Sequence, residues 1–597
     1  MTMYHFLGLN GVIIIRTLVI RWQKKKHFTR CVRFKGRQCE QARNAAKAGT
    51  VQSHLTTNLH RIIYMSLKSL PKNSNVAVLG AGILGLTFTY FLSKLRPDLN
   101  IEIFEKSNRP GGWMYLPHLH VTKTGESILL EKGPRTLRGI KNGSLFMIDI
   151  LRDLNIQDQV EVIHKSSNAN RKYITDAQGE IVQVPNSLAT TIDFFKHVQC
   201  VDGKLIKGLI KEPFVKPLAH DETVEQFFKR RFGSTALTDN VASAIMHGVY
   251  AGDIGKLSMK SVMPFLKDVE TQSGSIVKHI LRSIVKKSAK KNGLELLTEL
   301  QLYEKLISPG ANFFALQDDL KAFPMIKLKD GMETFPKHLA KYLVNNTNTN
   351  IHYGTPVRQC DPKLGEVNGQ SFDHVRSTIN SHSLAQALPQ ENPLVPDLKS
   401  VEYVSIFLTN LYTKKPVLLP KNKPGFGFLR PRHQNIDRNP QALLGTIYDS
   451  DIENNVQGLF TGEKATPNEC NKITIMMGGH YYNCWNIPSN KLNLKIVRDV
   501  LQEKLKVDLS KYNIKVIDEG QELEVDSIEP NDIVISYSLH KDCIPQYNLG
   551  YQELKARALD VLEKNNYKLS FGGTVFAEGL GVPDCVSNSF TDAVKLM

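Results

Sequence analysis

The stretch Val76-Ala-Val-Leu-Gly80-Ala-Gly82-Ile-Leu-Gly85 decides the fold. Its first four residues are apolar and predict a short strand buried in a parallel sheet, and the apolar pattern after Gly85 predicts a helix. In such a strand–turn–helix, Gly80 makes the tight turn, Gly82 lets the backbone approach a pyrophosphate, and Gly85 lets the helix pack closely on the strand. The helix N-terminus then presents free N–H groups to the phosphates.

A second predicted strand supports a dinucleotide site. Ile101-Glu-Ile-Phe104 ends at Glu105, which lies 20 residues after Gly85. A carboxylate at this point accepts hydrogen bonds from the ribose hydroxyls of a bound dinucleotide. The sequence therefore predicts an α/β dinucleotide-binding domain, and these residues leave the kind of dinucleotide open.

Three later segments indicate which dinucleotide is bound. Arg109-Pro-Gly-Gly-Trp113 and Glu131-Lys-Gly-Pro-Arg-Thr136 follow the second strand, and Glu578-Gly-Leu-Gly-Val-Pro-Asp584 turns into a predicted final helix. The proline of that last turn suits the first turn of a helix, and the aspartate suits its positive end. This arrangement resembles FAD enzymes of the amine oxidase superfamily, and nicotinamide dehydrogenases lack it.

Five segments narrow the resemblance to the family of oxygen-dependent protoporphyrinogen oxidases, in a mitochondrial, fungal-like form. The resemblance covers roughly residues 75–597. The segments are Glu131–Arg138, Asp221–Gly233, Gly248–Asp253, Leu444–Ser450 and His540–Tyr547.

The resemblance implies residues for both ligands. For the substrate it implies that Arg171 binds a propionate, that Gly248 lies against the macrocycle and that Met476 borders it. A guanidinium suits a carboxylate because it is permanently charged and geometrically matched. Lys106 stands where the family has a small residue, which puts a side-chain contact there in doubt. The residues implied for FAD are Gly80, Ala81, Gly82, Ile83, Leu84, Gly85, Glu105, Lys106, Trp113, Gly133, Pro134, Arg135, Thr136, Val357, Leu580, Gly581 and Val582.

The sequence contains no convincing nucleophile elbow, acid–base pair or HExxH motif. A flavoprotein oxidase needs none, since the cofactor carries the electron chemistry. The resemblance implies that protoporphyrinogen IX loses six hydrogens to give protoporphyrin IX, with molecular oxygen as acceptor and hydrogen peroxide as product, in haem biosynthesis. It also implies handover of the product to ferrochelatase.

The implied fold is α/β: an FAD-binding Rossmann-like domain with an inserted sheet-rich substrate domain and a mostly helical membrane-binding domain. On this basis we expect the FAD-binding domain at 75–165, 326–390 and 540–597. We expect the substrate domain at 166–194 and 391–539, the helical domain at 195–325, and a targeting or extension segment at 1–64.

The net charge of +18 is concentrated at the N-terminus. Residues 1–74 hold 14 Lys or Arg and a single acid, Glu40, while the rest of the chain holds 62 basic and 57 acidic side chains. This composition predicts a mitochondrial transit peptide rather than a surface for nucleic acid. The alternative is that Met65 is the true start.

The eight cysteines form no CxxC pair and no His cluster has zinc-ligand spacing, so we expect no metal site.

Two basic amphipathic stretches predict peripheral contact with the mitochondrial inner membrane. Residues 193–216 and 276–291 interleave apolar and basic side chains, which suits an anionic membrane surface. The alternative is a pair of solvated helix faces. No window of the sequence approaches 18 consecutive apolar residues, so the sequence predicts no helix that spans a bilayer.

Two rival functions remain. The first is another enzyme of the superfamily, such as an amine oxidase or a carotenoid desaturase, and a propionate-binding Arg171 argues against it. The second is a flavin-free binding protein like the Rab escort and dissociation-inhibitor proteins. The intact glycine loop, Glu105 and the C-terminal turn favour the enzyme.

Overall fold

The computed structural model describes residues 69–597, apart from residues 187, 199–202, 286–292, 421, 433–438 and 518–523. The predicted targeting segment, 1–64, lies outside the described residues. Within the described ranges, no helix combines the length and the apolar character needed to cross a membrane.

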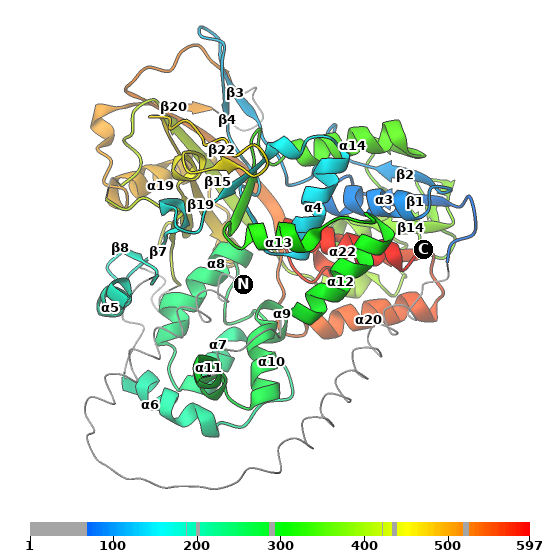
Figure 1. The fold of residues 1–597 in the computed structure, drawn as a ribbon, viewed down its shortest axis with the longest axis horizontal. Coiled ribbons are helices and arrows are strands. Elements are labelled where there is room, and N and C mark those ends of the chain that lie inside the picture. Colours follow the sequence, from blue (N-terminus) through cyan, green and yellow to red (C-terminus); the bar gives the residue numbers. More distant parts are fainter. Residues whose placement is uncertain are drawn as a thin grey trace.

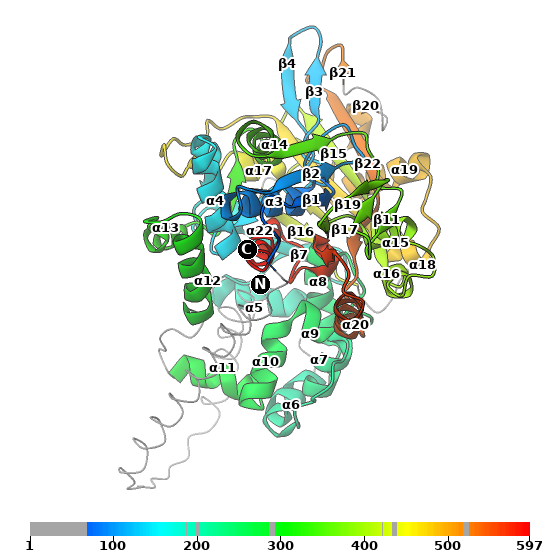
Figure 2. The same ribbon diagram turned by 90° about the vertical axis from the view of Figure 1, so that its right-hand side faces the viewer.

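A five-stranded parallel sheet forms the centre of the cofactor part (Figures 1 and 2). The first strand, β1, is buried from Val76 to Leu79, as its uninterrupted apolar sequence predicts. This sheet confirms the predicted α/β class. Its strands, in spatial order, are β10 (Thr349–His352), β2 (Asn100–Phe104), β1 (Asn75–Leu79), β14 (His374–Ser377) and β23 (Leu569–Phe571).

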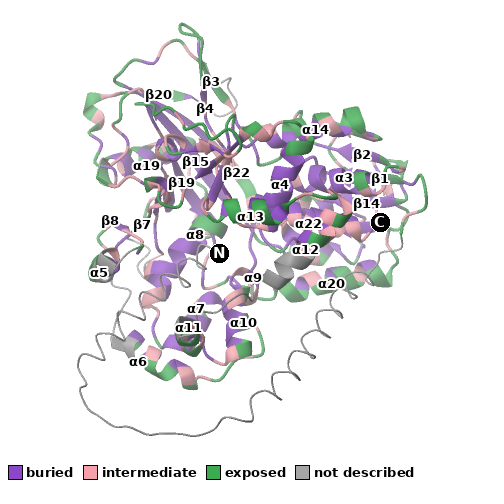
Figure 3. Cartoon of the chain, in the orientation of Figure 1, coloured by how far each residue is buried: buried purple, intermediate pink, exposed green. Residues whose placement is uncertain are grey.

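Helices from both ends of the chain cover this sheet. The glycine-loop helix α3 (Ile83–Leu95) packs against α22 (Val582–Val594), and α14 (Thr334–Asn346) packs against α3. Buried residues are concentrated in this layer around β1 and α3 (Figure 3). The segment that follows the glycine loop and the last helix of the chain therefore share one core.

One boundary of the predicted helical domain differs from the structure. Two helices within its expected range, α12 (Gly293–Leu306) and α13 (Phe313–Leu320), pack on the cofactor part against α4 (Asn142–Asp153). Tyr303 stacks on Phe146 with ring centroids 3.9 Å apart, and both rings contact Phe590 of α22. The aromatic contacts attach this segment to the cofactor core, so the helical domain ends before residue 325.

An eight-stranded sheet forms the sheet-rich part and draws on both segments expected for it. The expected boundary at residue 540 falls inside its strand β22, which continues to Pro545 and enters the cofactor part. In spatial order the strands are β20 (Asn513–Ile517), β22 (Asp532–Pro545), β15 (Tyr403–Thr413), β19 (Asn471–Gly479), β17 (Leu443–Ile447), β16 (Gly427–Leu429), β7 (Lys172–Thr175) and β8 (Ile181–Gln183).

The helical part lies below the other two in Figure 1 and is held by a buried charge cluster. The Arg231 guanidinium, fully buried, forms ion pairs with Glu212 at 3.1 Å and Glu270 at 2.6 Å. Thr223 and Gln226 form a capping box at the start of α7. The helices are α5 (Leu188–His197), α6 (Gly203–Lys211), α7 (Val224–Phe232), α8 (Ser243–Tyr250), α9 (Met259–Val262), α10 (Pro264–Ser273) and α11 (Ile276–Val285).

Three small sheets complete the fold. One of them, with β3 and β4, projects from the molecule (Figure 2). They comprise β18 (Gln457–Gly458), β6 (Val160–Ile163), β9 (Met325–Leu328) and β5 (Leu137–Arg138); β21 (Glu524–Val525), β3 (His118–Val121) and β4 (Glu126–Leu129); and β11 (Cys360–Asp361), β12 (Glu366–Val367) and β13 (Gln370–Ser371).

Candidate functional site

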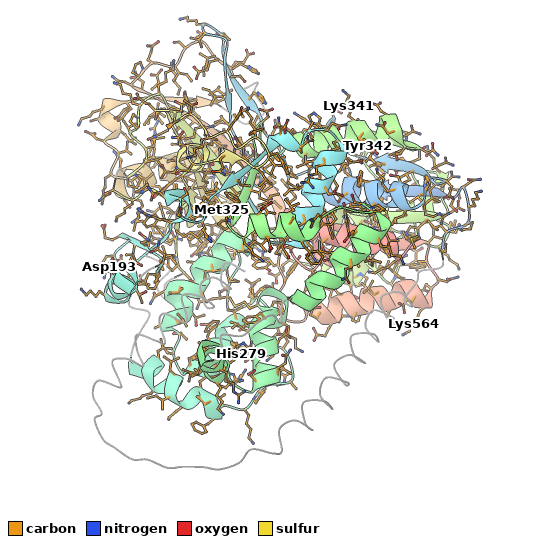
Figure 4. The ribbon with its side chains drawn as sticks, in the orientation of Figure 1. Asp193, His279, Met325, Lys341, Tyr342 and Lys564 are labelled. Carbon is orange, nitrogen blue, oxygen red and sulfur yellow. The ribbon has the colours of Figure 1, made fainter. Side chains whose placement is uncertain are left out.

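A single cavity of about 2450 Å³ runs between the cofactor, sheet-rich and helical parts. Met325, which lines it, lies near the place where the three parts meet (Figure 4). Sites for one small molecule have volumes of roughly 300–1,000 Å³. The cavity is therefore large enough to hold a dinucleotide and a second ligand together.

The glycine loop forms one end of this cavity. Gly80 has φ +99°, the left-handed region, and its N–H donates to the Phe104 carbonyl at 2.8 Å. A Cβ at Gly85 would lie 2.0 Å from the Gly80 carbonyl oxygen, whereas a Cβ at Gly82 would meet no protein atom within 4 Å. Gly85 is thus required by packing inside the protein. The space in front of Gly82 is open and faces the cavity, as an approaching pyrophosphate requires.

Glu105 ties this loop to the end of β2. One carboxylate oxygen accepts from the Ala81 N–H at 2.8 Å, and the other accepts from the Ser107 N–H at 2.9 Å and its hydroxyl at 2.7 Å. The carboxylate is buried yet lines the cavity, and oxygens of this kind keep further acceptor capacity for a ribose hydroxyl. Lys106, exposed, and Val357 line the same end.

The turn from Gly133 to Thr136 lines the middle of the cavity. A Cβ at Gly133 would lie 2.1 Å from the Trp113 carbonyl oxygen, so the two segments are in close contact. The Arg135 guanidinium bonds the carbonyls of Glu131 and Gly133 and forms an ion pair with Asp449 at 2.6 Å. The Arg135 guanidinium therefore fixes the conformation of the turn by bonding both to the backbone of the turn and to Asp449.

The C-terminal turn also lines the cavity, next to the α22 helix that packs on α3. Leu580, Gly581 and Val582 line it, and α22 begins at Val582 with a proline in its first turn, as predicted. Asp584 lies in the same first turn and forms an ion pair with Lys141. Lys141 also lines the cavity.

Two side chains in the middle of the cavity were missed by the sequence analysis. The His540 ring meets the half-exposed Trp113 edge to face, 5.3 Å between ring centroids, and burial together with nearby Lys132 lowers the pKa of His540 to about 4. The buried Lys132 ammonium donates to the Ser536 hydroxyl at 2.9 Å. Both residues lie in segments that carry the family resemblance, and that position in the sequence was the available signal.

The far end of the cavity has an apolar floor. Met476 of β19 and Leu429 of β16 lie on one face of the eight-stranded sheet, and α8 crosses over them. A Cβ at Gly248 of α8 would lie 2.7 Å from the Leu429 Cδ1 atom, so the helix comes close to the floor at this point. Gly248 and Met476 thus line the same compartment, where the resemblance places the macrocycle.

Most of the residues expected to bind a ligand line this one cavity, with three exceptions. Ala81 and Gly85 are buried behind the loop. Arg171 is not part of the cavity wall: its side chain lies beside Tyr173, whose hydroxyl donates to the Pro424 carbonyl at 2.9 Å. Asn170, Lys172 and Tyr173, the neighbours of Arg171 in the chain, do line the cavity.

Comparison with known proteins places the chain among flavoenzymes. The signature of the family described as flavin containing amine oxidoreductase matches residues 85–562. The chain is 33% identical to protoporphyrinogen oxidase of Saccharomyces cerevisiae, covering 89% of this chain and 99% of that protein. It is 29% identical to protoporphyrinogen oxidase of Schizosaccharomyces pombe, covering 87% and 98%.

A solved structure shows the same fold. It comes from Exiguobacterium sp. 255-15, is provisionally named a protoporphyrinogen oxidase, and superposes with a TM-score of 0.61 over 87% of this chain and 98% of that one. The sequence identity is 17%, so this likeness supports the fold alone.

Proposed function

We propose that this chain, which belongs to the family of flavin-containing amine oxidoreductases and within it to the protoporphyrinogen oxidases, uses FAD to convert protoporphyrinogen IX into protoporphyrin IX in haem biosynthesis. One observation carries the proposal. A single cavity joins a dinucleotide end at Gly82 to an apolar compartment between α8 and the sheet. A tetrapyrrole, which is large, flat and mostly apolar, fits such a compartment.

The chain's own residues bind the cofactor and the substrate and orient them. The N-terminus of α3 and the open space at Gly82 suit the diphosphate, and Glu105 suits the adenosine ribose. Bound FAD supplies the two-electron redox chemistry. The turn at Gly133 and the floor around Met476 line the cavity in which the two ligands would meet. No acid or base among the side chains needs to be assigned a part in carbon–hydrogen cleavage.

Molecular oxygen is the proposed electron acceptor, with hydrogen peroxide as product. An aerobic assay on the purified chain tests this function directly. Protoporphyrin fluorescence and hydrogen peroxide are expected to rise together after addition of protoporphyrinogen IX. A yellow protein that leaves protoporphyrinogen unchanged would contradict the substrate, and a protein that takes up no FAD would contradict the cofactor.

The helical part carries a surface suited to an anionic membrane. Phe214 is 84% exposed and Ile210 67% exposed, although both are large apolar side chains. The surroundings are basic: Lys278 lies 5.8 Å from the Phe214 ring centre, and Lys204, Lys207 and Lys211 on α6 are exposed. An apolar tip within a basic surface is the pattern of a peripheral membrane protein. Peripheral association with the mitochondrial inner membrane is therefore part of the proposal.

Replacing Lys204, Lys207 and Lys211 with Glu is expected to reduce binding to vesicles of phosphatidylcholine and phosphatidylglycerol. Each cation near such a surface contributes about 1 kcal/mol, so the loss is expected to exceed tenfold at low salt. The control variant reverses Lys341, Lys363 and Lys564, of which Lys341 and Lys564 lie on the cofactor part, away from α6 (Figure 4). Equal vesicle binding by both variants would show that the basic face of α6 is a solvated helix face and not a membrane contact. Lys286, Lys287, Lys290 and Lys291 of the predicted basic stretch lie outside the described residues.

Location in mitochondria is proposed from the composition of residues 1–64. Deleting them is expected to abolish import into isolated mitochondria while leaving oxidase activity of the purified chain unchanged, since the cavity is built from residue 80 onward. Efficient import of the truncated chain would instead identify Met65 as a start with internal targeting. Handover of the product to ferrochelatase belongs to the same proposal, because an apolar product favours transfer at a membrane.

A further inference from the structure

Two histidines to which the proposed function gives no part face each other beside the apolar compartment. His247 of α8 lines the cavity and is 3% exposed, and the partly buried His480 follows the end of β19. Their Nε2 atoms lie 3.0 Å apart, and the two rings stack with 5.1 Å between centroids. Gly248, the next residue after His247, and Met476, on the strand before His480, line the compartment. The contact therefore joins the two elements that carry these residues.

The hydrogen-bond partners show which nitrogen of each ring carries a hydrogen. The Nδ1 atom of His247 lies 2.7 Å from the Arg430 carbonyl oxygen, which only accepts, so Nδ1 is the donor. Burial lowers the pKa of His247 to about 3 and that of His480 to about 4, so both rings are neutral at neutral pH. The Nε2 atom of a neutral His247 is then an acceptor, and the Nε2–H of His480 donates to it. The one lone pair of the His247 ring is thus used inside the protein, which makes this ring unsuited to take a proton from a substrate.

Backbone hydrogen bonds extend this contact to the sheet and to the end of α8. The N–H of His480 donates to the carbonyl of Ala251, the C-terminal cap of α8, at 2.8 Å. The N–H of Arg430 donates to the Leu444 carbonyl of β17 at 2.9 Å, so the residue whose carbonyl accepts from His247 is itself tied to the sheet. The last turn of α8 is therefore bonded both to the sheet through Arg430 and to the end of β19 through His480.

Close contacts leave this last turn little room to move. Ala251 has φ +49°, the left-handed region, which a residue with a side chain seldom adopts. A Cβ at Gly479 would lie 2.4 Å from the Ala251 carbonyl oxygen, so the two backbones are in direct contact. Such a backbone conformation persists only where the surrounding contacts maintain it. The hydrogen bonds of His480 are among those contacts.

A separate group of ion pairs attaches the helical part to the sheet-rich part. Arg432, which follows β16, forms ion pairs with Glu225 at 2.9 Å, with Asp239 at 2.7 Å and with Asp253 at 3.2 Å. These pairs remain when the bond between the two imidazoles is removed. We therefore expect loss of that bond to displace the turn that carries Gly248, and not to detach the helical part.

We propose that His247 and His480 are positioning residues, whose imidazole–imidazole hydrogen bond fixes α8 against the end of β19 and thereby sets the shape of the compartment that receives the tetrapyrrole. This rests on the proposed function and deepens it. Gly248 and Met476 lie on the two elements that the bond joins. Its loss is therefore expected to alter the substrate end of the cavity and to leave the glycine loop unchanged.

His480→Leu tests the proposal because it removes the donor and leaves the Nε2 atom of His247 buried without a partner. An unpaired buried acceptor is costly, and we expect displacement of α8 to raise the Michaelis constant for protoporphyrinogen IX about tenfold. Binding of protoporphyrin IX, followed by its fluorescence, is expected to weaken by a similar factor, with flavin content unchanged. His480→Gln, whose side-chain amide provides a donor for His247, is expected to restore most of the affinity.

The matched control is His374→Leu. His374 is also a buried histidine, with one ring nitrogen 2.8 Å from the Ser570 hydroxyl, but it belongs to β14 and does not line the cavity. Both leucine variants are expected to lose thermal stability. Only His480→Leu is expected to change the Michaelis constant and product binding, measured per bound flavin. This contrast separates positioning of the substrate compartment from the general loss of a buried polar contact.

A second variant keeps the test available if His480→Leu does not fold. His247→Asn keeps a donor for the Arg430 carbonyl and removes the acceptor for His480, so it is expected to raise the Michaelis constant like His480→Leu. Because both substitutions remove the same bond, their effects in the double variant should not add.

The outcomes distinguish this proposal from the function itself. A wild-type chain that does not oxidise protoporphyrinogen would overturn the proposed function. An active wild type, with an unchanged Michaelis constant and unchanged product binding in His480→Leu and His247→Asn, would overturn the present inference alone. Equal losses in His480→Leu and His480→Gln would also overturn it, because the hydrogen bond would then not be the cause.

Discussion

Gly82→Val is expected to yield a folded protein without flavin. A Cβ at Gly82 meets no protein atom within 4 Å, so the fold can accept the larger side chain. The branched side chain would occupy the approach path of the pyrophosphate, and bound flavin is expected to fall from one per chain to almost none. The measurement is the flavin absorbance of the purified protein, with circular dichroism to show that the fold is intact.

The contrasting variant is Gly85→Ala, three residues along the same loop. Its Cβ would lie 2.0 Å from the Gly80 carbonyl oxygen, so the cost falls on the packing of α3 against β1. This variant is expected to lose thermal stability as well as flavin. Full flavin content in Gly82→Val would show that the glycine loop does not bind the cofactor.

Arg135→Met is expected to destabilise the protein and to release the cofactor. The guanidinium and its partner Asp449 are both nearly buried, and the same guanidinium holds the carbonyls of Glu131 and Gly133. Removing one member of a buried pair leaves the other uncompensated and costs roughly 3–5 kcal/mol. Urea unfolding of the holoprotein measures the stability, and retention of flavin on dilution measures the loosened turn.

The matched control is Arg557→Met, which removes an arginine paired with Asp397 at the surface. Exposed pairs are screened by water, and we expect a much smaller change in the unfolding midpoint. Equal midpoints for the two variants would show that Arg135 does not support the turn.

The cofactor end could be predicted from sequence because its determinants are local. The glycine loop, the strand before it and Glu105 lie within about 30 residues, and each residue type has a specific physical task. The C-terminal turn could be predicted for the same reason, since Pro583 and Asp584 mark the start of a helix by themselves.

The substrate end depends on which way a strand faces, and the sequence does not contain that information locally. A resemblance points to Arg171, whereas the cavity wall includes its neighbours Asn170, Lys172 and Tyr173. The packing of α12 and α13 on the cofactor part is similarly non-local, because it depends on Tyr303 meeting Phe146 and Phe590 across long separations in the chain. His540 lies opposite Trp113 for the same reason.

Anaerobic mixing of the purified yellow protein with protoporphyrinogen IX tests the central claim most directly. If the cavity holds FAD and the substrate together, the yellow absorbance is expected to disappear as protoporphyrin fluorescence appears, and oxygen should restore the colour with release of hydrogen peroxide. The Gly82→Val protein should show neither change. A yellow protein whose absorbance persists in excess protoporphyrinogen, with no protoporphyrin formed, would contradict the account.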